Sequence, residues 1–486
     1  MTPRFPFVLG LMCALVLPLQ ARADDPALAL HVLNRLAYGP RPGEVERVAA
    51  VGVAQYIAAQ LEPARIAIPA DVTSRVGALS TQQLSAGQIY RRYGPPSYPP
   101  KNASEEVQKQ ARQRQGEIQT ETHQARLILA LTSPRQLEEV MTEFWFNHFN
   151  VFEGKDTVRM WVGHFERSAI RPYALGRFRE LLGAVAHHPA MLVYLDNWLS
   201  SAAGTPDARG RFRGLNENYA RELLELHTLG VDGGYTQADV IALARILTGW
   251  TLDDLGMAAG RDEAFVFAPR RHDFTDKVLL GNRIKGTGYT EGERALDLLA
   301  AHPSTARRIA FKLVQQFVSD TPDAGLVQRV AQRFTATQGD ISATLKMLFE
   351  SPDFLQASNH MNKFKTPYRY AISALRAVDN VPENLRPIEG FLQQTAMPLY
   401  GWITPDGYRT TTEAWLNPDA VLRRISLAVA IGAGRWPDQQ REPPDGDRVA
   451  QLLGDVLTAE QRTAVAEAPA RQRVGLLLGS PAFMKY

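Results

Sequence analysis

The chain has a single cysteine, Cys13, which lies within the first 23 of its 486 residues. If that segment is removed, no thiol remains, which excludes disulfides, thiolate metal sites and cysteine nucleophiles from the rest of the chain. Met12 stands before Cys13 where a lipid-attached cysteine would need a small residue. Stability must then come from a hydrophobic core, and about 460 residues are enough to bury one.

The chain also lacks an excess of charge of either sign. The chain has 54 Lys and Arg against 51 Asp and Glu, a net charge of +3 that falls to +1 when Arg4 and Arg22 are subtracted. Such a balance does not create the basic surface typical of nucleic-acid binding, so no nucleic-acid partner is expected. After residue 23 no apolar run approaches 18 residues, and we therefore predict no membrane insertion.

Residues 1–23 have the three-part layout of a secretory signal peptide. Arg4 gives a basic start, residues 7–19 are apolar, and Ala21 and Ala23 provide the small residues of a cleavage site. The apolar stretch is shorter than the roughly 20 residues that a spanning helix needs. We expect cleavage near Ala23 and a periplasmic or secreted location.

Apolar residues three and four apart recur along most of the chain, which is the pattern of amphipathic helices. Helices are expected, among others, at residues 104–131, 136–149, 174–187, 216–229, 236–248, 291–301, 305–317, 324–337, 341–350, 368–378, 450–457 and 459–478. Strict alternation occurs at residues 263–267 and 277–280, which could pair as a hairpin. The pattern predicts an all-α fold class, a large multi-helix globular domain with few or no short strands. Residues 24–486 form this single domain, or carry an additional C-terminal helical lobe from about residue 380.

Several catalytic motifs are missing. The chain contains no His-Glu-x-x-His, no Gly-x-Ser-x-Gly, no phosphate-binding glycine loop and no dinucleotide fingerprint. Zincin proteases, ordinary serine esterases, nucleotide hydrolases and nicotinamide enzymes are therefore disfavoured. No nucleotide or nicotinamide cofactor is expected.

The densest polar segment is residues 216–228. At about 100° per residue, a helix there separates an apolar arc that includes Leu226 and His227 from a polar arc. The polar arc carries Glu217, Asn218, Arg221, Glu222, Glu225 and Thr228. Three carboxylates on one face can line a polar cleft. Alternatively, the face is solvated and joined by ion pairs of Arg221 with Glu217 and Glu225 at i, i+4 spacing.

A second candidate is the aromatic helix that contains Glu143. Its aromatic residues cover most of the circumference and leave Glu143, Asn147 and Asn150 on a narrow polar edge. A carboxylate against an aromatic wall must be paired or have its pKa raised, which suits a general acid and equally a structural ion pair. His148 lies among these aromatics, as a hydrogen-bonded core residue or as a site residue.

Two loops allow a metal interpretation beside a structural one. Asp232 begins a stretch that imitates half of a calcium loop, but Thr236 and Asp239 fit a helix-capping box better. His272 and Asp273 are neighbours after an apolar segment and can act as a base, a metal ligand or part of a surface turn.

The longest of these strings resemble the bacterial domain of unknown function family 1800. The resemblance covers nearly the whole mature chain and depends on residues 33–40, 143–149, 218–240 and 247–250, with His272, Asp273, His302 and Lys312. Ser304 and Arg308 depart from it, since Ala and His are expected there. It implies a mostly helical fold, export, and a companion from the family of unknown function 1501, which looks like the sulfatase and alkaline-phosphatase fold. It supplies no reaction.

The resemblance also implies that residues 218–227, Asn147, His148, Trp250, His272 and Asp273 meet around one site. Our hypothesis is an exported hydrolase-like enzyme with a carboxylate-lined cleft, acting on a glycan, in which Glu222 is the general acid or base and Glu143 or Glu217 the second carboxylate. The expected substrate-binding residues are Asn147, His148, Asn218, Arg221, Trp250, His272 and Asp273. A divalent metal near His148, His272 or Asp232 stays open. The alternative is a non-catalytic partner or scaffold for the companion protein.

Overall fold

The computed structural model describes residues 24–205, 214–436, 439–440 and 442–486, so the expected signal peptide at residues 1–23 lies outside the described residues. Helices dominate the described chain, and its strands form three two-stranded antiparallel sheets. The all-α prediction is confirmed. None of the described helices is both long and apolar enough to cross a membrane.

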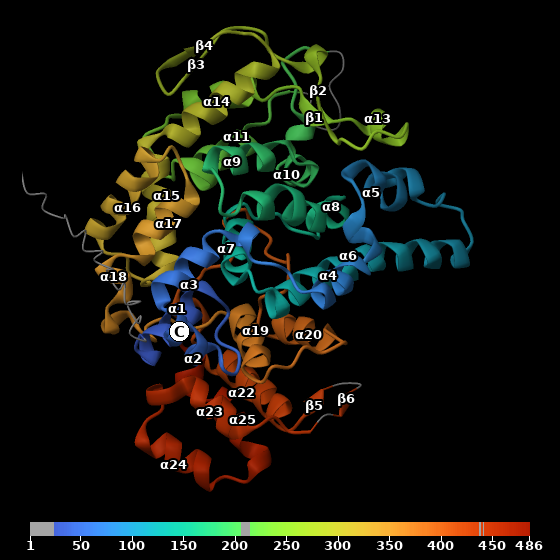
Figure 1. Ribbon diagram of the computed structural model, residues 1–486. Coiled ribbons are helices and arrows are strands. Elements are labelled where there is room, and N and C mark those ends of the chain that lie inside the picture. Colours follow the sequence, from blue (N-terminus) through green and yellow to red (C-terminus); the bar gives the residue numbers. More distant parts are fainter. Residues whose placement is uncertain (1–23, 206–213, 437–438, 441) are drawn as a thin grey trace, which may run out of the picture.

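The first half of the chain builds the centre of the molecule (Figure 1). Its helices are α1 (Pro26–Leu36), α2 (Glu44–Val51), α3 (Val53–Gln60), α4 (Ala70–Gly77), α5 (Ala86–Tyr93), α6 (Glu105–Thr132), α7 (Gln136–His148), α8 (Val158–Phe165), α9 (Phe178–His187) and α10 (Pro189–Tyr194). The side chain of Ser104 caps α6 by accepting a hydrogen bond from the Val107 amide. The aromatic helix α7 is central, and its Trp145 is fully buried.

The polar segment after residue 216 is not one regular α-helix. It consists of α11 (Glu217–Glu222) followed by the π-helical segment η7 (Leu223–Thr228). The wider π turn changes the angle between successive side chains, so faces assigned at about 100° per residue no longer hold beyond Leu223. Thr228, expected on the polar arc, is fully buried, and Leu226, expected on the apolar arc, is partly exposed. The predicted division of faces is therefore wrong for these two residues.

The strands between residues 250 and 284 lie near one end of the molecule and pair locally (Figure 1). The segment comprises α12 (Gln237–Ile246), β1 (Trp250–Leu252), α13 (Asp254–Ala258), β2 (Phe265–Phe267), β3 (Lys277–Leu279) and β4 (Asn282–Ile284). β2 pairs with β1, and β3 pairs with β4, so the expected hairpin between residues 263–267 and 277–280 is wrong. Leu280 and Gly281 both have positive φ and form the two-residue turn that joins β3 to its neighbour.

The second half of the chain closes the core and extends it to the opposite end of the molecule. Its elements are α14 (Tyr289–Ala301), α15 (Pro303–Phe317), α16 (Ala324–Ala336), α17 (Ile341–Phe349), α18 (Pro352–Leu355), α19 (Pro367–Ala377), α20 (Arg386–Gln394), α21 (Thr412–Trp415), α22 (Pro418–Gly432), β5 (Arg435–Trp436), β6 (Gln439–Gln440), α23 (Gly446–Leu453), α24 (Ala459–Glu467), α25 (Ala470–Leu478) and α26 (Pro481–Met484).

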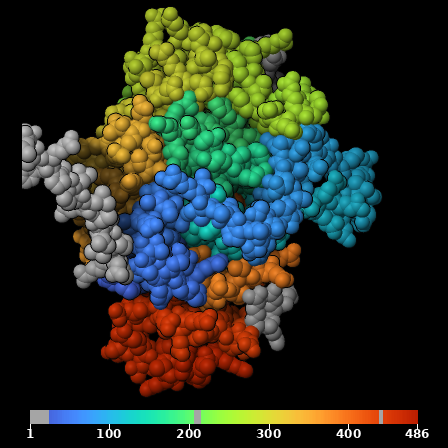
Figure 2. All heavy atoms as spheres, viewed as in Figure 1, coloured from blue at the N-terminus to red at the C-terminus, as the bar shows by residue number. Residues whose placement is uncertain are grey.

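The C-terminal helices α22 to α25 gather at that end, as the space-filling view also shows (Figure 2). Buried Tyr370 of α19 joins them to the centre, because its hydroxyl lies within hydrogen-bonding distance of the backbone carbonyls of Arg424 and Leu478, at 2.9 and 3.0 Å. A continuous cluster of buried apolar side chains runs from Ala29 to Met484. The described elements thus share one core.

Candidate functional site

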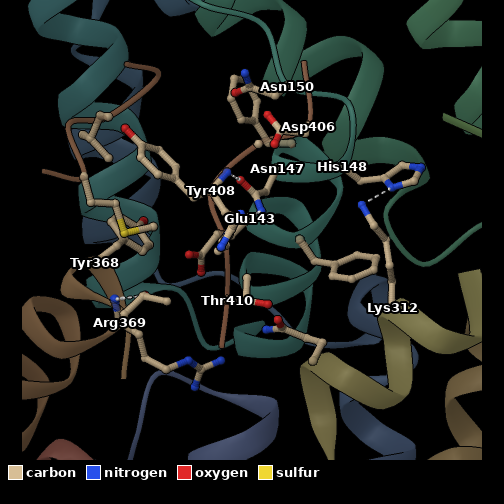
Figure 3. A pocket seen from close by; sticks show the side chains of 18 of the residues that line it. Glu143, Asn147, His148, Asn150, Lys312, Tyr368, Arg369, Asp406, Tyr408 and Thr410 are labelled. Atoms are coloured by element: carbon tan, nitrogen blue, oxygen red, sulfur yellow. Dashed lines mark hydrogen bonds between the residues drawn. The ribbon is translucent and has the colours of Figure 1, made fainter. Parts of the chain in front are cut away.

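A cavity of about 340 Å³ opens between α7, α15, the start of α19 and the loop at residues 397–411 (Figure 3). We call it the α7–α15 pocket. Its aromatic lining consists of Phe144, Phe146, Tyr368, Tyr400, Tyr408 and Tyr486. Charged and amide side chains share the same walls. A concave site with aromatic surface and a few convergent polar groups is the usual form of a small-molecule pocket.

One wall of the pocket is the 397–411 loop, which two asparagines of the α7 region hold in place. The Asn147 amide accepts a hydrogen bond from the Tyr408 N–H at 2.7 Å and donates to the Tyr408 carbonyl at 2.8 Å. Asn150 donates to the carbonyls of Trp402 and Thr404 at 3.0 and 2.8 Å. Asn147 therefore lines the pocket, as expected of a site residue, but its amide is engaged with the loop backbone.

Two carboxylates face this cavity. The carboxylate of Glu143, on α7, accepts a hydrogen bond from the Tyr38 hydroxyl at 2.8 Å. No other described side chain bonds this carboxylate. Asp406, on the loop, accepts from the Trp402 indole at 2.9 Å and from the Thr404 hydroxyl through the same oxygen, Oδ1. Each carboxylate thus has one oxygen that a described residue fixes and another that accepts no hydrogen bond from a described side chain.

A basic pair lies at the side of the pocket next to α15. The His148 Nε2–H donates to the His227 carbonyl at 3.1 Å, which leaves Nδ1 as the acceptor for the Lys312 amine at 3.0 Å. Burial, and after it the Lys312 and Arg308 charges, lower the pKa of His148 well below its usual range. Burial, followed by Arg308, also lowers the pKa of Lys312 to about 7, against the opposing effect of Asp406.

The aromatic wall includes a fixed cation, Arg126, which also lines the pocket. The Arg126 guanidinium lies 5.1 to 5.3 Å from the ring centres of Phe146, Tyr368 and Tyr400. It pairs with buried Glu166 at 3.0 Å, and Glu166 also accepts from the Tyr400 hydroxyl at 3.1 Å. Arg126 shares Glu166 as counter-ion with Arg171, so it is a paired cation that supports the rings.

Residues 31–485 match the family described as protein of unknown function (DUF1800). The chain belongs to this family. No curated protein and no solved structure matches it.

In this DUF1800 chain the polar face of α11 is not part of the pocket lining. Arg221 lies 3.6 Å from Glu217 and 3.5 Å from Glu225, the i, i+4 pairs of the alternative reading, and it donates to Gln237 at 2.8 Å. Asn218 is exposed. Burial, and after it Glu225, raise the pKa of half-buried Glu222, which also interacts electrostatically with Asp406 of the loop.

Trp250, His272 and Asp273 lie elsewhere in the DUF1800 fold. Trp250 is fully buried and packs against the His187 ring at 4.6 Å. His272 is buried between the Glu291 carboxylate at 2.9 Å and the Thr248 carbonyl at 2.7 Å. Asp273 pairs with Arg245 at 2.7 Å. The structure therefore brings only Glu143, Asn147 and His148 of the predicted residues together, which corrects the expectation of one shared site.

The loop after Asp232 has the geometry of a helix cap. Thr236 and Asp239 form the expected capping box at the start of α12. Among the described residues, no group of three His, Cys, Asp or Glu side chains is arranged to hold a metal ion.

Sequence reasoning missed Lys312 and Asp406 as site residues. Asp406 lies in a stretch of loop aromatics with an Asp-Gly turn signal, and Lys312 lies one helical turn after Arg308. Neither signal reveals that α15 and the loop face α7.

Proposed function

We propose that this chain is an exported hydrolase-like enzyme that acts on a glycan in the α7–α15 pocket, with Glu143 and Asp406 as its carboxylate pair. The observation that carries the proposal is that both carboxylates line one aromatic-lined cavity, each with one oxygen that no described side chain bonds. Glycoside hydrolysis requires two carboxyl groups on either side of the scissile bond, one acting as acid and the other as base or nucleophile. This pair replaces Glu222 and Glu217, which do not line the pocket.

The other polar groups have supporting roles in this proposal. His148 and Lys312 bind or orient the sugar at the α15 side, and Asn147 keeps Asp406 in position by holding the loop. The tyrosine and phenylalanine rings offer flat apolar surface to a sugar ring. A signal peptide at residues 1–23 would deliver the protein to the periplasm or outside the cell, where such polymers occur.

The test is hydrolysis of a panel of envelope and environmental polysaccharides, followed as release of reducing ends. Glu143→Gln and Asp406→Asn should each reduce the rate by about 10²- to 10⁴-fold, the usual contribution of a general acid or base, without lowering the melting temperature. Glu217→Gln is the matched control, because its side chain is 40% exposed and outside the pocket. Full activity of both pocket variants would refute the proposal.

Glu222→Gln separates this proposal from the one that the sequence alone suggested. Glu222 is half-buried at the end of α11, so its substitution should change activity far less than either pocket substitution. If Glu222→Gln instead abolishes turnover at an unchanged melting temperature, the catalytic carboxylate is Glu222 and the pocket assignment is incorrect.

A second candidate is a non-catalytic partner or scaffold for a companion exported protein of the family of unknown function 1501. It is favoured by an apolar stripe on α22, where Leu422, Ile425 and Val429 are 62%, 38% and 55% exposed at helical spacing. Leu422→Glu combined with Val429→Glu should abolish co-purification with the co-expressed companion. Leu255→Glu is the control, because Leu255 is 79% exposed on α13. A complex that survives the double substitution would exclude this surface.

A further inference from the structure

The basic groups on the α15 side of the pocket form no ion pair with any described residue. Lys312 lines the cavity, donates to His148, and makes no ion pair with any described residue. Asp406, the acid that influences Lys312 electrostatically, is not within ion-pair distance of it. Lys312 is thus a pocket lysine whose amine has a neutral imidazole, not a carboxylate, as its partner.

The groups packed around Lys312 do not supply the missing charge. Arg308, one turn earlier on α15, uses its Nε to donate to the Leu226 carbonyl and has no ion pair among the described residues. His227 of η7 is fully buried, and neither nitrogen of its ring has a hydrogen-bond partner among the described residues. Burial, then Lys312, lowers the pKa of His227 to about 3. Four basic groups from α7, η7 and α15 therefore share one region, and among the described residues Asp406 is the acid that acts electrostatically on Lys312.

Building on the proposed function, we infer that Lys312 binds an anionic group of the saccharide, so that the pocket selects an acidic saccharide over its neutral counterpart. The amine is held by His148 through one hydrogen bond and can direct its other protons into the cavity. A bound carboxylate or sulfate supplies the counter-ion that this region lacks, in a partly desolvated setting where charge-assisted hydrogen bonds are strong.

Anion binding at Lys312 must be coupled to proton uptake. The pKa of the free amine is about 7, so about half of the lysine is charged at that pH. A bound anion favours the charged form and raises this pKa. Binding near pH 7 should then take up about half a proton, and uptake should vanish near pH 5, where the amine is already charged. His148 and His227 have lowered pKa values and stay neutral at these pH values.

Calorimetric titration of the full chain tests this inference. An oligogalacturonate is compared with its fully methyl-esterified, neutral form, in two buffers of different ionisation enthalpy. The acidic oligomer should bind at least about tenfold more tightly, with uptake of about half a proton near pH 7. A sulfated galactan oligomer is titrated in parallel. Whichever acidic oligomer binds more tightly, with dependence on Lys312, identifies the anionic group.

Three variants assign the effect to Lys312. Lys312→Met should remove the preference for the acidic oligomer, and Lys312→Arg should keep the preference but abolish the proton uptake, because arginine stays charged. Lys346→Met is the matched control, since Lys346 is 57% exposed on α17. If Lys312→Met does not fold, the loss of proton uptake in Lys312→Arg still decides the question.

Equal binding of acidic and neutral oligomers would overturn the inference, as would proton uptake that persists in Lys312→Arg. These outcomes are separate from failure of the proposed function. If Glu143→Gln abolishes hydrolysis while the charge of the oligomer makes no difference, the enzyme assignment stands and the anion site is refuted. If acidic oligomers bind through Lys312 but Glu143→Gln and Asp406→Asn stay fully active, the anion site stands and the assignment of the catalytic carboxylates is refuted.

Discussion

Replacing Gly407 with alanine tests whether α7 holds the loop wall of the pocket. Gly407 has φ +74°, and a Cβ at this position would lie 2.1 Å from the Asn147 carbonyl oxygen. The left-handed backbone costs a non-glycine residue about 1 kcal/mol. Contact with a backbone atom cannot be relieved by rotating a side chain, so the loop must move and break the two hydrogen bonds between Asn147 and Tyr408, at about 1 kcal/mol each. The total cost is roughly 3 kcal/mol.

Gly281→Ala provides the matched control for this prediction. Gly281 has almost the same φ, +75°, but no heavy atom lies within 4 Å of its added Cβ, so only the backbone cost of about 1 kcal/mol applies. Urea denaturation of both variants gives the two free energies, and hydrogen exchange of the Tyr408 amide shows whether the loop has detached. Equal destabilisation by the two substitutions, with Tyr408 still protected, would refute the close contact between the loop and α7.

Three further predictions concern Asn147, His227 and Trp250. Asn147→Asp should be less stable than the wild type near neutral pH, and should recover relative to Asn147→Ala on acidification, because only a protonated carboxyl can donate to the Tyr408 carbonyl. Burial lowers the pKa of His227 from 6.5 to about 3, so the stability linked to its neutral ring is complete above pH 6.5 and is lost as the pH falls toward 3. His227→Phe should therefore lose less melting temperature than the wild type between about pH 7 and about pH 5. Trp250→Ala should cost about 3–5 kcal/mol of stability in denaturation, and an unchanged rate per folded molecule would show that Trp250 is no site residue.

Elements that depend on local signals could be predicted from the sequence. The expected helix at residues 104–131 is observed as α6, and Thr236 with Asp239 caps α12 as expected. Residues 459–478 were expected as one helix, but the structure has α24 and α25 with a break at Ala468 and Pro469. Proline disfavours helical backbone in the residue before it, and Ala468 is extended. Apolar periodicity continued across the break and concealed this stop signal.

The pocket could be predicted only on its α7 side. Glu143, Asn147 and His148 are close in sequence, and their spacing on one helix already indicates a shared region. Lys312 and Asp406 reach the same cavity through tertiary packing, and Asn147 contacts a loop residue 261 positions away. No periodicity or local motif encodes such a contact. The densest polar string, around Glu222, lies outside the pocket lining. Its Arg221 pairs with Glu217 and Glu225 at i, i+4 spacing, so a dense run of charges there reflects ion pairs on the helix surface.

The segment formed by α11 and η7 still contacts a residue of the pocket, through a backbone carbonyl rather than through its carboxylates. The carbonyl of His227, at the end of η7, accepts from His148 Nε2–H and so determines which ring nitrogen faces Lys312. If this carbonyl were turned away, His148 could present N–H to the amine, which would then lose its acceptor. The π turn places the carbonyl at this point, since a regular helix would change the direction of the residues after Leu223. The backbone geometry of η7, more than the charge of its side chains, thus determines that His148 presents an unprotonated Nδ1 to the Lys312 amine.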